Sequence, residues 1–126
     1  MHRSRLAQII IDCQVSDLQD AAAFWGEALG RPVRKLADAV DANYRELVAI
    51  DGDINILVQR VAHPSRVHLD IETDDVEAEV RRLEGLGAVR VEQVRTWWVM
   101  EAPTGQRFCV LQPQTDMLSK HGNLWT

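Results

Sequence analysis

The fold is decided by two stretches that follow one pattern, LAQIIIDC at residues 6–13 and RVHLDIE at residues 66–72. LAQIIIDC is rich in β-branched residues and breaks at a polar segment, which is typical of a buried strand, and RVHLDIE alternates apolar with polar residues as a strand does. When the two are aligned, Ile10 falls on His68 and Asp12 falls on Asp70. The chain is therefore expected to contain a repeated unit that begins with a strand.

A helix is expected after each of these strands. Ser16 with Gln19, and Asp74 with Glu77, have the spacing of a capping box at a helix N-terminus. Apolar residues recur at helical spacing behind both caps, so one face of each helix should pack on a sheet. Each helix is expected to end at a Leu-Gly pair, at residues 29–30 and 86–87.

The rest of each half is predicted to be strands. After a polar connection at residues 37–43, Gly52 marks a hairpin turn, and His63-Pro64-Ser65 interrupts the pattern as a linker. Gly105 marks the equivalent turn in the second half. The expected strands are residues 44–50 and 54–59, then 89–94, 96–101 and 107–112.

Composition excludes several classes of protein. The 126 residues suit one domain, and 46% hydrophobic with 26% charged residues is ordinary for a globular chain. With 14 basic and 19 acidic residues the net charge is −5, which disfavours nucleic acid and anionic membranes as partners. No apolar run is long enough to span a bilayer. We expect a cytoplasmic protein whose two cysteines, Cys13 and Cys109, are thiols.

The sequence resembles the glyoxalase/bleomycin resistance/dioxygenase superfamily, also called the vicinal oxygen chelate superfamily, over residues 6–113. The resemblance lies in Asp12-Cys13, in VHLDI at residues 67–71 and in LEGLGA at residues 83–88. It also lies in AAAFWGEALG at residues 21–30 and APTGQRFCVLQ at residues 102–112. These motifs are specific for the fold, but the fold serves many reactions.

The resemblance implies an α+β fold of two βαβββ modules that form a curved, cup-like mixed sheet, with a small molecule bound in the cup. The modules are expected at about residues 5–61 and 66–113 of a single glyoxalase-like domain. Residues 114–126 form a C-terminal tail that either frays, covers a sheet edge or makes a dimer contact. Many relatives pair modules across a dimer, so a homodimer is expected.

Metal-dependent relatives place one ligand on the first strand and one on the last strand of each module. Carried onto this chain, those positions are Ile10, Ile56, His68 and Cys109. Two isoleucines have no lone pair to offer a metal, so the standard ligand set is broken. No cofactor is therefore expected, and a divalent metal at His68 is disfavoured.

His68 and Asp70 are the main catalytic candidates. Strand alternation places them on one face, roughly 6 to 7 Å apart along the strand, with the apolar Val67 and Leu69 on the face toward the helix. A histidine beside carboxylates can act as a general acid or base. Asp12, the repeat partner of Asp70, joins them as a candidate, and the alternative for both aspartates is a structural polar cluster.

Five further residues are candidates for ligand binding. Trp97 and Trp98 are adjacent on one expected strand, so only one of them faces the cup. In the repeat alignment Tyr44 falls on Trp97, and Gln59 falls on Gln112. Cys109 completes the ligand-binding set, but as a nucleophile it lacks a base beside it in the sequence, so a small buried residue is the favoured interpretation.

Three functions follow from these residues. The first is a metal-independent lyase or isomerase in which His68, with Asp70 or Asp12, carries protons. The second is a resistance-type protein that sequesters a drug or metabolite against aromatic side chains. The third, a metal-dependent glyoxalase or dioxygenase, is disfavoured by Ile10 and Ile56.

Overall fold

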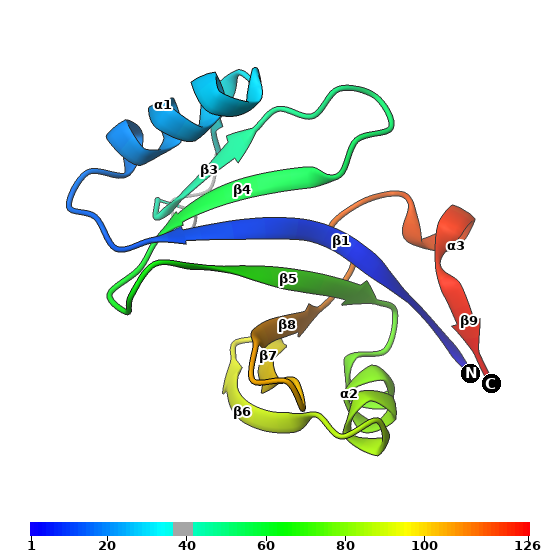
Figure 1. The fold of residues 1–126 in the computed structure, drawn as a ribbon. Coiled ribbons are helices and arrows are strands. Elements are labelled where there is room, and N and C mark those ends of the chain that lie inside the picture. Colours follow the sequence, from blue (N-terminus) through cyan, green and yellow to red (C-terminus); the bar gives the residue numbers. More distant parts are fainter. Residues whose placement is uncertain (37–41) are drawn as a thin grey trace. The chain divides into compact units, whose positions relative to one another are not determined.

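The structure is a computed structural model that describes residues 1–36 and 42–126. The chain forms two compact units, here called the first unit (residues 8–67) and the second unit (residues 1–7 and 68–126). Figure 1 shows their helices and strands. Part of the expected polar connection, residues 37–41, lies outside the described residues.

The first unit is a four-stranded mixed sheet with one helix. Its strands lie in the order β2-β3-β4-β1, with β4 parallel to β1 and the other pairs antiparallel. Helix α1 lies against β3 and β4 (Figure 1). Its core joins Ala22 of α1 to Leu47 and Val58 of the sheet. The elements are β1 (His2–Cys13), α1 (Leu18–Leu29), β2 (Val33–Lys35), β3 (Tyr44–Leu47) and β4 (Asn55–Arg60).

The second unit repeats this arrangement. Its strands lie in the order β5-β8-β7-β6, with β8 parallel to β5 and the other pairs antiparallel. Val80 of α2 packs with Met100 and Val110 of the sheet. The elements are β5 (Arg66–Thr73), α2 (Val76–Gly85), β6 (Val89–Val94), β7 (Trp97–Glu101), β8 (Arg107–Leu111), α3 (Leu118–His121) and β9 (Asn123–Trp125).

The α+β class with two βαβββ units is therefore confirmed. The expected strands are present within a few residues, and β2 is an additional short strand after Pro32. Among the described residues, no helix has the length and apolar character needed to cross a membrane.

Both predicted N-caps are wrong by one residue. Asp17, not Ser16, accepts a hydrogen bond from the backbone N–H of Gln19, and Asp75, not Asp74, accepts one from Ala78. Aspartate, serine and threonine all cap helices, so neighbouring cap residues cannot be ranked by type. Asp74 instead accepts a hydrogen bond from the backbone N–H of Arg3. Glu77 pairs with arginines, Arg81 and Arg90, rather than completing a capping box.

The apolar face of β5 is only partly covered. Leu69 pairs in register with Phe108, whose side chain packs on the α2 side of the sheet, yet Leu69 is 46% exposed. Val67 is 57% exposed. The expectation that these residues pack under the helix is therefore wrong, because α2 packs mainly on β6, β7 and β8 and leaves both side chains exposed.

The C-terminal tail is fixed to the second unit rather than frayed. Strand β9 pairs with the first residues of β1, so the two chain ends lie side by side in Figure 1. The fully buried Glu72 carboxylate accepts hydrogen bonds from the backbone N–H groups of Gln114 (2.7 Å) and Thr115 (2.9 Å) and from Arg5 (2.9 Å). The tail thus covers an edge of this unit, as one of the alternatives expected.

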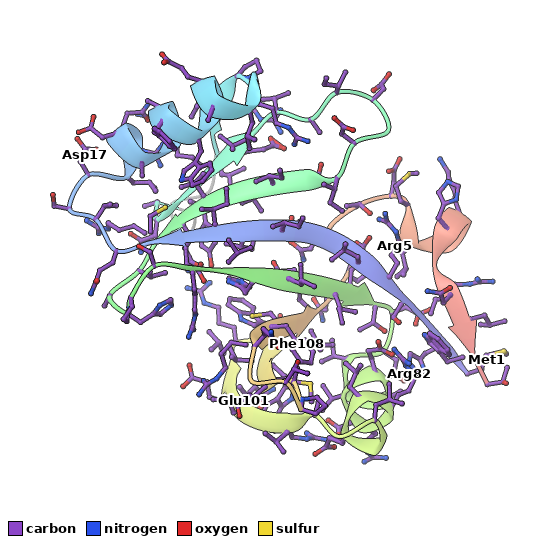
Figure 2. All side chains as sticks on the ribbon, in the orientation of Figure 1. Met1, Arg5, Asp17, Arg82, Glu101 and Phe108 are labelled. Carbon is purple, nitrogen blue, oxygen red and sulfur yellow. The ribbon has the colours of Figure 1, made fainter. Side chains whose placement is uncertain are left out.

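A second buried carboxylate ties the chain ends to α2. Glu79 accepts two hydrogen bonds from Arg82 and lies 2.8 Å from His2 Nε2. The Arg82 guanidinium lies 3.8 Å from the ring centre of Trp125, and the Trp125 indole N–H donates to Ser4 Oγ at 2.8 Å. Figure 2 labels Arg82 on α2 and Met1 at the chain start. Although burial raises the pKa of Glu79, the hydrogen bonds from Arg82 and His2 outweigh it and hold that pKa below 4.5.

Glu79→Gln is predicted to destabilise the protein in a pH-dependent way. Because the folded pKa of Glu79 is depressed, its stabilising effect is present above pH 4.5 and is lost as the pH falls through the folded pKa. We expect a loss of about 2 kcal/mol at neutral pH, where Arg82 loses a charged partner, and a smaller loss in acid. Urea unfolding at several pH values measures this difference. A loss that is constant with pH would contradict the assignment.

Gly26 and Gly85 provide a matched pair of glycine substitutions on the two helices. A Cβ at Gly26 would lie 2.8 Å from Val33 Cγ2 and 2.9 Å from the Arg31 carbonyl oxygen, whereas a Cβ at Gly85 meets nothing within 4 Å. Gly26→Ala should lower the free energy of unfolding by about 1 to 3 kcal/mol. Gly85→Ala should raise it by up to about 1 kcal/mol. Thermal unfolding of both variants tests the packing of α1 on β2.

Candidate functional site

The parallel register of β5 and β8 brings a small polar cluster together in the second unit. Asp70 pairs with Cys109, and Leu69 and Ile71 pair with Phe108 and Val110. Side chains of paired residues point to the same face of a sheet, and alternate residues of a strand share a face. His68, Asp70 and Cys109 therefore lie together on one face of the sheet.

These three side chains converge on one another. His68 Nε2 lies 3.3 Å from Asp70 Oδ1, and one ligand-type atom from each of His68, Asp70 and Cys109 lies within 4.8 Å of the others. Asp70 is 5% exposed, whereas His68 and Cys109 are half-buried. The cluster is thus shielded from bulk water on its Asp70 side and still reachable through His68 and Cys109.

The cluster lies on the face of the sheet opposite α2. Val110 and Met100 point toward α2 and form the core, and Phe108, labelled on β8 in Figure 2, packs beside them. Cys109 alternates with Phe108 and Val110, so its side chain takes the other face. The helix therefore fills one face of this sheet and leaves the polar cluster on the other.

The two adjacent tryptophans separate in the same way. Trp98 pairs with Val110 and packs on the core beside α2, with the Arg90 guanidinium 4.9 Å from its ring centre. Val99 pairs with Cys109, so Trp97, two residues before Val99, lies on the face of the polar cluster. Of the two tryptophans, Trp97 is therefore the one on the face that carries His68, two strands away on β7.

The first unit carries a comparable row of polar side chains. Tyr44 pairs with Gln59, and Gln59 pairs with Asp12, so the three lie side by side across β3, β4 and β1. Asp12 is 2% exposed, with Arg66 Nε 3.8 Å from its Oδ2. Ile10 occupies the position on this face that His68 occupies in the second unit. Tyr44, Gln59 and Asp12 are thus brought together, but without a histidine.

Strand pairing corrects part of the repeat alignment. Gln59 lies beside Asp12 as Cys109 lies beside Asp70, so Gln59 is the counterpart of Cys109 and not of Gln112. Ile56, proposed above as a lost ligand position, pairs with Ile9 and packs on the α1 side. The alignment was wrong because the hairpins of the two halves differ in length, and a shift by an odd number of residues exchanges the faces.

The structure also corrects the interpretation of Cys109. The sequence around it holds no base, yet His68 lies within 4.8 Å on the neighbouring strand. A parallel strand pair brings together residues far apart in the chain, and neither strand alone shows its partner. No local pattern in QRFCVLQ marks this contact.

The two cysteines differ in their surroundings. Cys13 is buried in the core of the first unit, where burial and then the negative charge of Asp12 raise the pKa of its thiol. Its sulfur lies 3.7 Å from the Ile11 carbonyl oxygen. Cys109 instead lies beside a histidine on a half-buried face. Cys13 is therefore an inert thiol, and Cys109 is the one placed for chemistry.

The residues of the cluster fit a divalent metal ion. Imidazole nitrogen, carboxylate oxygen and thiolate sulfur are all zinc ligands, and three protein ligands suffice for an open zinc site. Over residues 1–36 and 42–126, His68, Asp70 and Cys109 form the only such group. In the first unit, Ile10 lies at the position that His68 occupies in the second unit. The described part of the first unit therefore has no matching set of three metal ligands.

Comparison with known proteins identifies related sequences and folds. A family model described as a glyoxalase-like domain matches residues 8–111. No curated protein matches the chain.

Solved structures with similar folds carry several names. Methylmalonyl-CoA epimerase from Mycobacterium tuberculosis has a TM-score of 0.61 at 18% identity, with 89% of each chain covered. Methylmalonyl-CoA epimerase from Streptomyces coelicolor has a TM-score of 0.54 at 15% identity, with 88% of this chain and 96% of that chain covered. A structure named NAD-dependent benzaldehyde dehydrogenase from Legionella pneumophila has a TM-score of 0.59 at 9% identity, with 83% and 99% covered. At such low identities these likenesses show the fold alone.

Substitution of the two tryptophans should affect stability unequally. Trp98→Ala removes a ring packed on the core beside α2 and should lower the free energy of unfolding by about 2 kcal/mol or more. Trp97→Ala removes a ring from the opposite face and should cost less than about 1 kcal/mol. Urea unfolding of both variants tests the assignment of faces, which equal losses would contradict.

Proposed function

Since the chain belongs to the glyoxalase-like domain family, we propose that it binds a small carbonyl-containing molecule and transfers a proton on it, as an isomerase or lyase does. The observation that supports this proposal is the 3.3 Å contact between His68 Nε2 and Asp70 Oδ1 on a half-buried face. A proton next to a carbonyl is acidic enough for such a base to remove when the enzyme stabilises the resulting negative charge.

His68 carries the proton in this proposal. A histidine changes protonation near neutral pH, so it can both accept a proton and return it within one catalytic cycle. Asp70 fixes the orientation of the imidazole and stabilises its protonated form, because a buried carboxylate attracts the positive charge strongly. Return of the proton by His68 to a different atom on the same face of the planar intermediate gives isomerisation, and loss of a leaving group gives a lyase reaction.

Trp97 in the second unit is proposed to bind ligand rather than to transfer protons, and the row of Tyr44 and Gln59 in the first unit is proposed separately as a set of polar ligand contacts. An indole ring offers a flat apolar surface for a planar or acyl group. Tyr44 and Gln59 offer hydrogen-bond donors and acceptors, and Asp12, with Arg66 nearby, is assigned the structural role. A metal ion held by His68, Asp70 and Cys109 would supply Lewis-acid polarisation of a substrate oxygen, but the proton transfer proposed here needs none.

The epimerase fold relatives suggest a first substrate to test. Methylmalonyl-CoA belongs to the required chemical class, since its reacting carbon lies between two carbonyl groups. We also propose that the protein acts in the cytoplasm as a homodimer, which is the arrangement that the family resemblance implies.

Hydrogen exchange in D2O tests the proposed proton transfer. Purified protein is incubated in EDTA with methylmalonyl-CoA and other acids or thioesters that carry an acidic C–H, and proton NMR follows loss of the C–H signal. We expect catalysed exchange that falls by about 100-fold or more in His68→Ala and less in Asp70→Asn. His63→Ala is the matched control, because His63 lies between β4 and β5, outside the cluster, with its Nδ1 2.8 Å from the Pro64 carbonyl oxygen. Exchange that survives in His68→Ala would refute the role of His68.

The alternative function is sequestration of a drug or metabolite without turnover. It is favoured by the position of Trp97 on the same face as His68, where stacking alone can bind a planar ligand. A ligand that quenches tryptophan fluorescence, binds more weakly to Trp97→Ala and undergoes no exchange or conversion would establish this function instead.

A further inference from the structure

Arg107 is a charged residue that lies next to the proposed base and that the proton transfer described above does not use. Strands β5 and β8 are parallel, and Asp70 pairs with Cys109. His68, two residues before Asp70, therefore stands next to Arg107, two residues before Cys109. Neighbouring strands lie about 4.8 Å apart, and residues two positions apart share a face. Arg107 thus lies beside His68 on the face that carries the polar cluster.

An ion pair with β7 holds the Arg107 side chain on this face. Arg107 pairs with Glu101 in the antiparallel ladder of β7 and β8, and Arg107 Nε lies 3.2 Å from Glu101 Oε1. Glu101 is labelled in Figure 2. Over residues 1–36 and 42–126, Arg107 donates hydrogen bonds through Nε alone, which leaves its two terminal nitrogens for a ligand. The side chain of Arg107 is 36% exposed, so a ligand can reach it.

We propose that Arg107 binds a carboxylate of the substrate next to the C–H that His68 deprotonates, so that the protein acts on acids rather than on neutral carbonyl compounds. This inference deepens the proposed function, because it names the substrate class of the same site, and its catalytic part rests on that function. The binding of a carboxylate by Arg107 does not require turnover and can be tested separately.

The guanidinium group selects the kind of ligand. It is planar and presents its N–H donors in a fixed fork, which matches the two oxygens of a carboxylate. Hydrogen bonds between ionised partners of this kind are about twice as strong as those between neutral groups. Arginine also stays protonated in proteins, so the positive charge of Arg107 is present throughout the working pH range.

The ion pair with Glu101 orients the guanidinium group without blocking it. Both partners are partly exposed, at 36% for Arg107 and 39% for Glu101, and exposed ion pairs contribute little to stability. A carboxylate that binds the terminal nitrogens need not displace Glu101, which uses Nε. What distinguishes this pair from the similar pair of Arg81 and Glu77 on α2 is its position beside His68.

A bound carboxylate also affects the proposed proton transfer. When His68 removes the proton, the C–H bond breaks, an N–H bond forms on the imidazole, and the electron pair moves into the carbonyl group to give an enolate. A carboxylate on the reacting carbon repels this negative charge and opposes the step. Arg107 offsets the repulsion without giving up a proton, so it should raise kcat as well as lower KM.

A matched pair of small probes tests the binding without turnover. Protein labelled with 15N in arginine is titrated with malonate or with its neutral diamide, malonamide, at an ionic strength held constant with sodium chloride. NMR records the Nε–H signals of the arginine side chains, and the signal absent from Arg107→Lys belongs to Arg107. We expect malonate to shift this signal in a saturable way and malonamide to leave it unchanged. Equal shifts with both probes, or no shift with excess malonate, would overturn the inference.

Substitutions measure the size of the effect. By calorimetry, malonate should bind about 10-fold or more weakly to Arg107→Gln. The loss should be smaller in Arg107→Lys, which keeps the charge but lacks the fork. Arg81→Gln is the matched control, because Arg81 Nε also lies 3.2 Å from a glutamate, Glu77, but on α2. Malonate binding that is equal in wild type and Arg107→Gln would contradict the proposal. The titration of the wild-type protein avoids any folding defect of a variant.

Exchange of an acid and of its methyl ester separates this inference from the proposed function. In D2O, Arg107→Gln should lower kcat/KM for C–H exchange of the acid by about 100-fold and leave that of the ester within about 3-fold. Equal losses for acid and ester, or no loss, would overturn the inference and leave the proton transfer by His68 standing. If neither compound exchanges with the wild-type protein, the proposed proton transfer fails, and the malonate titration still decides whether Arg107 binds a carboxylate.

Discussion

The register between β5 and β8 is the constraint on which the candidate chemistry depends. Pairing of Asp70 with Cys109 places both on the face that α2 does not cover, while Val110 and Met100 take the covered face. A shift of one residue would put Cys109 in the core and a valine beside Asp70. The apolar contacts with α2 therefore fix the polar cluster indirectly. Because alternate residues of a strand point to opposite faces, a residue that packs against α2 places its chain neighbours on the other face.

Sequence alone predicted the repeat, most elements in their order and the polar face of β5, because these depend on local patterns, but it missed β2, α3 and β9. Alternation in VHLDIE identifies His68 and Asp70 as neighbours on one face, and the structure brings them within 3.3 Å. It could not identify Cys109 as their neighbour, since contact between parallel strands depends on a crossover of some 40 residues rather than on local sequence. The assignment of Ile56 to the polar face was wrong for a related reason. The strand around Ile56 carries apolar residues on both faces, so its sequence does not indicate which face Ile56 takes.

The tail shows a different limit of sequence reasoning. Glu72 and Glu79 stand among polar residues that look solvated, yet both are fully buried. Both have partners from the ends of the chain, Thr115 and Arg5 for Glu72 and His2 for Glu79, and Arg82 of α2 also donates to Glu79. A buried charge is tolerated only when hydrogen bonds satisfy it, and the chain ends supply those bonds here. The termini are thus part of the polar interior of the second unit, although their composition alone suggests a frayed segment.

The two aspartates at equivalent positions explain why we propose chemistry in only one half of the repeat. Asp12 has Arg66 nearby and Gln59 beside it, so its charge is balanced by a group that stays positive at neutral pH. Asp70 has His68 and Cys109 beside it, and imidazole and thiol are side-chain types that enzymes use to exchange protons. Two aspartates at equivalent positions of equivalent strands are therefore suited to different roles. A carboxylate can assist proton transfer when the side chain beside it can change charge. The first unit has Ile10 at the position that His68 occupies in the second unit, so it has polar groups but no histidine to carry a proton. This difference between the units favours a single reaction centre in the second unit.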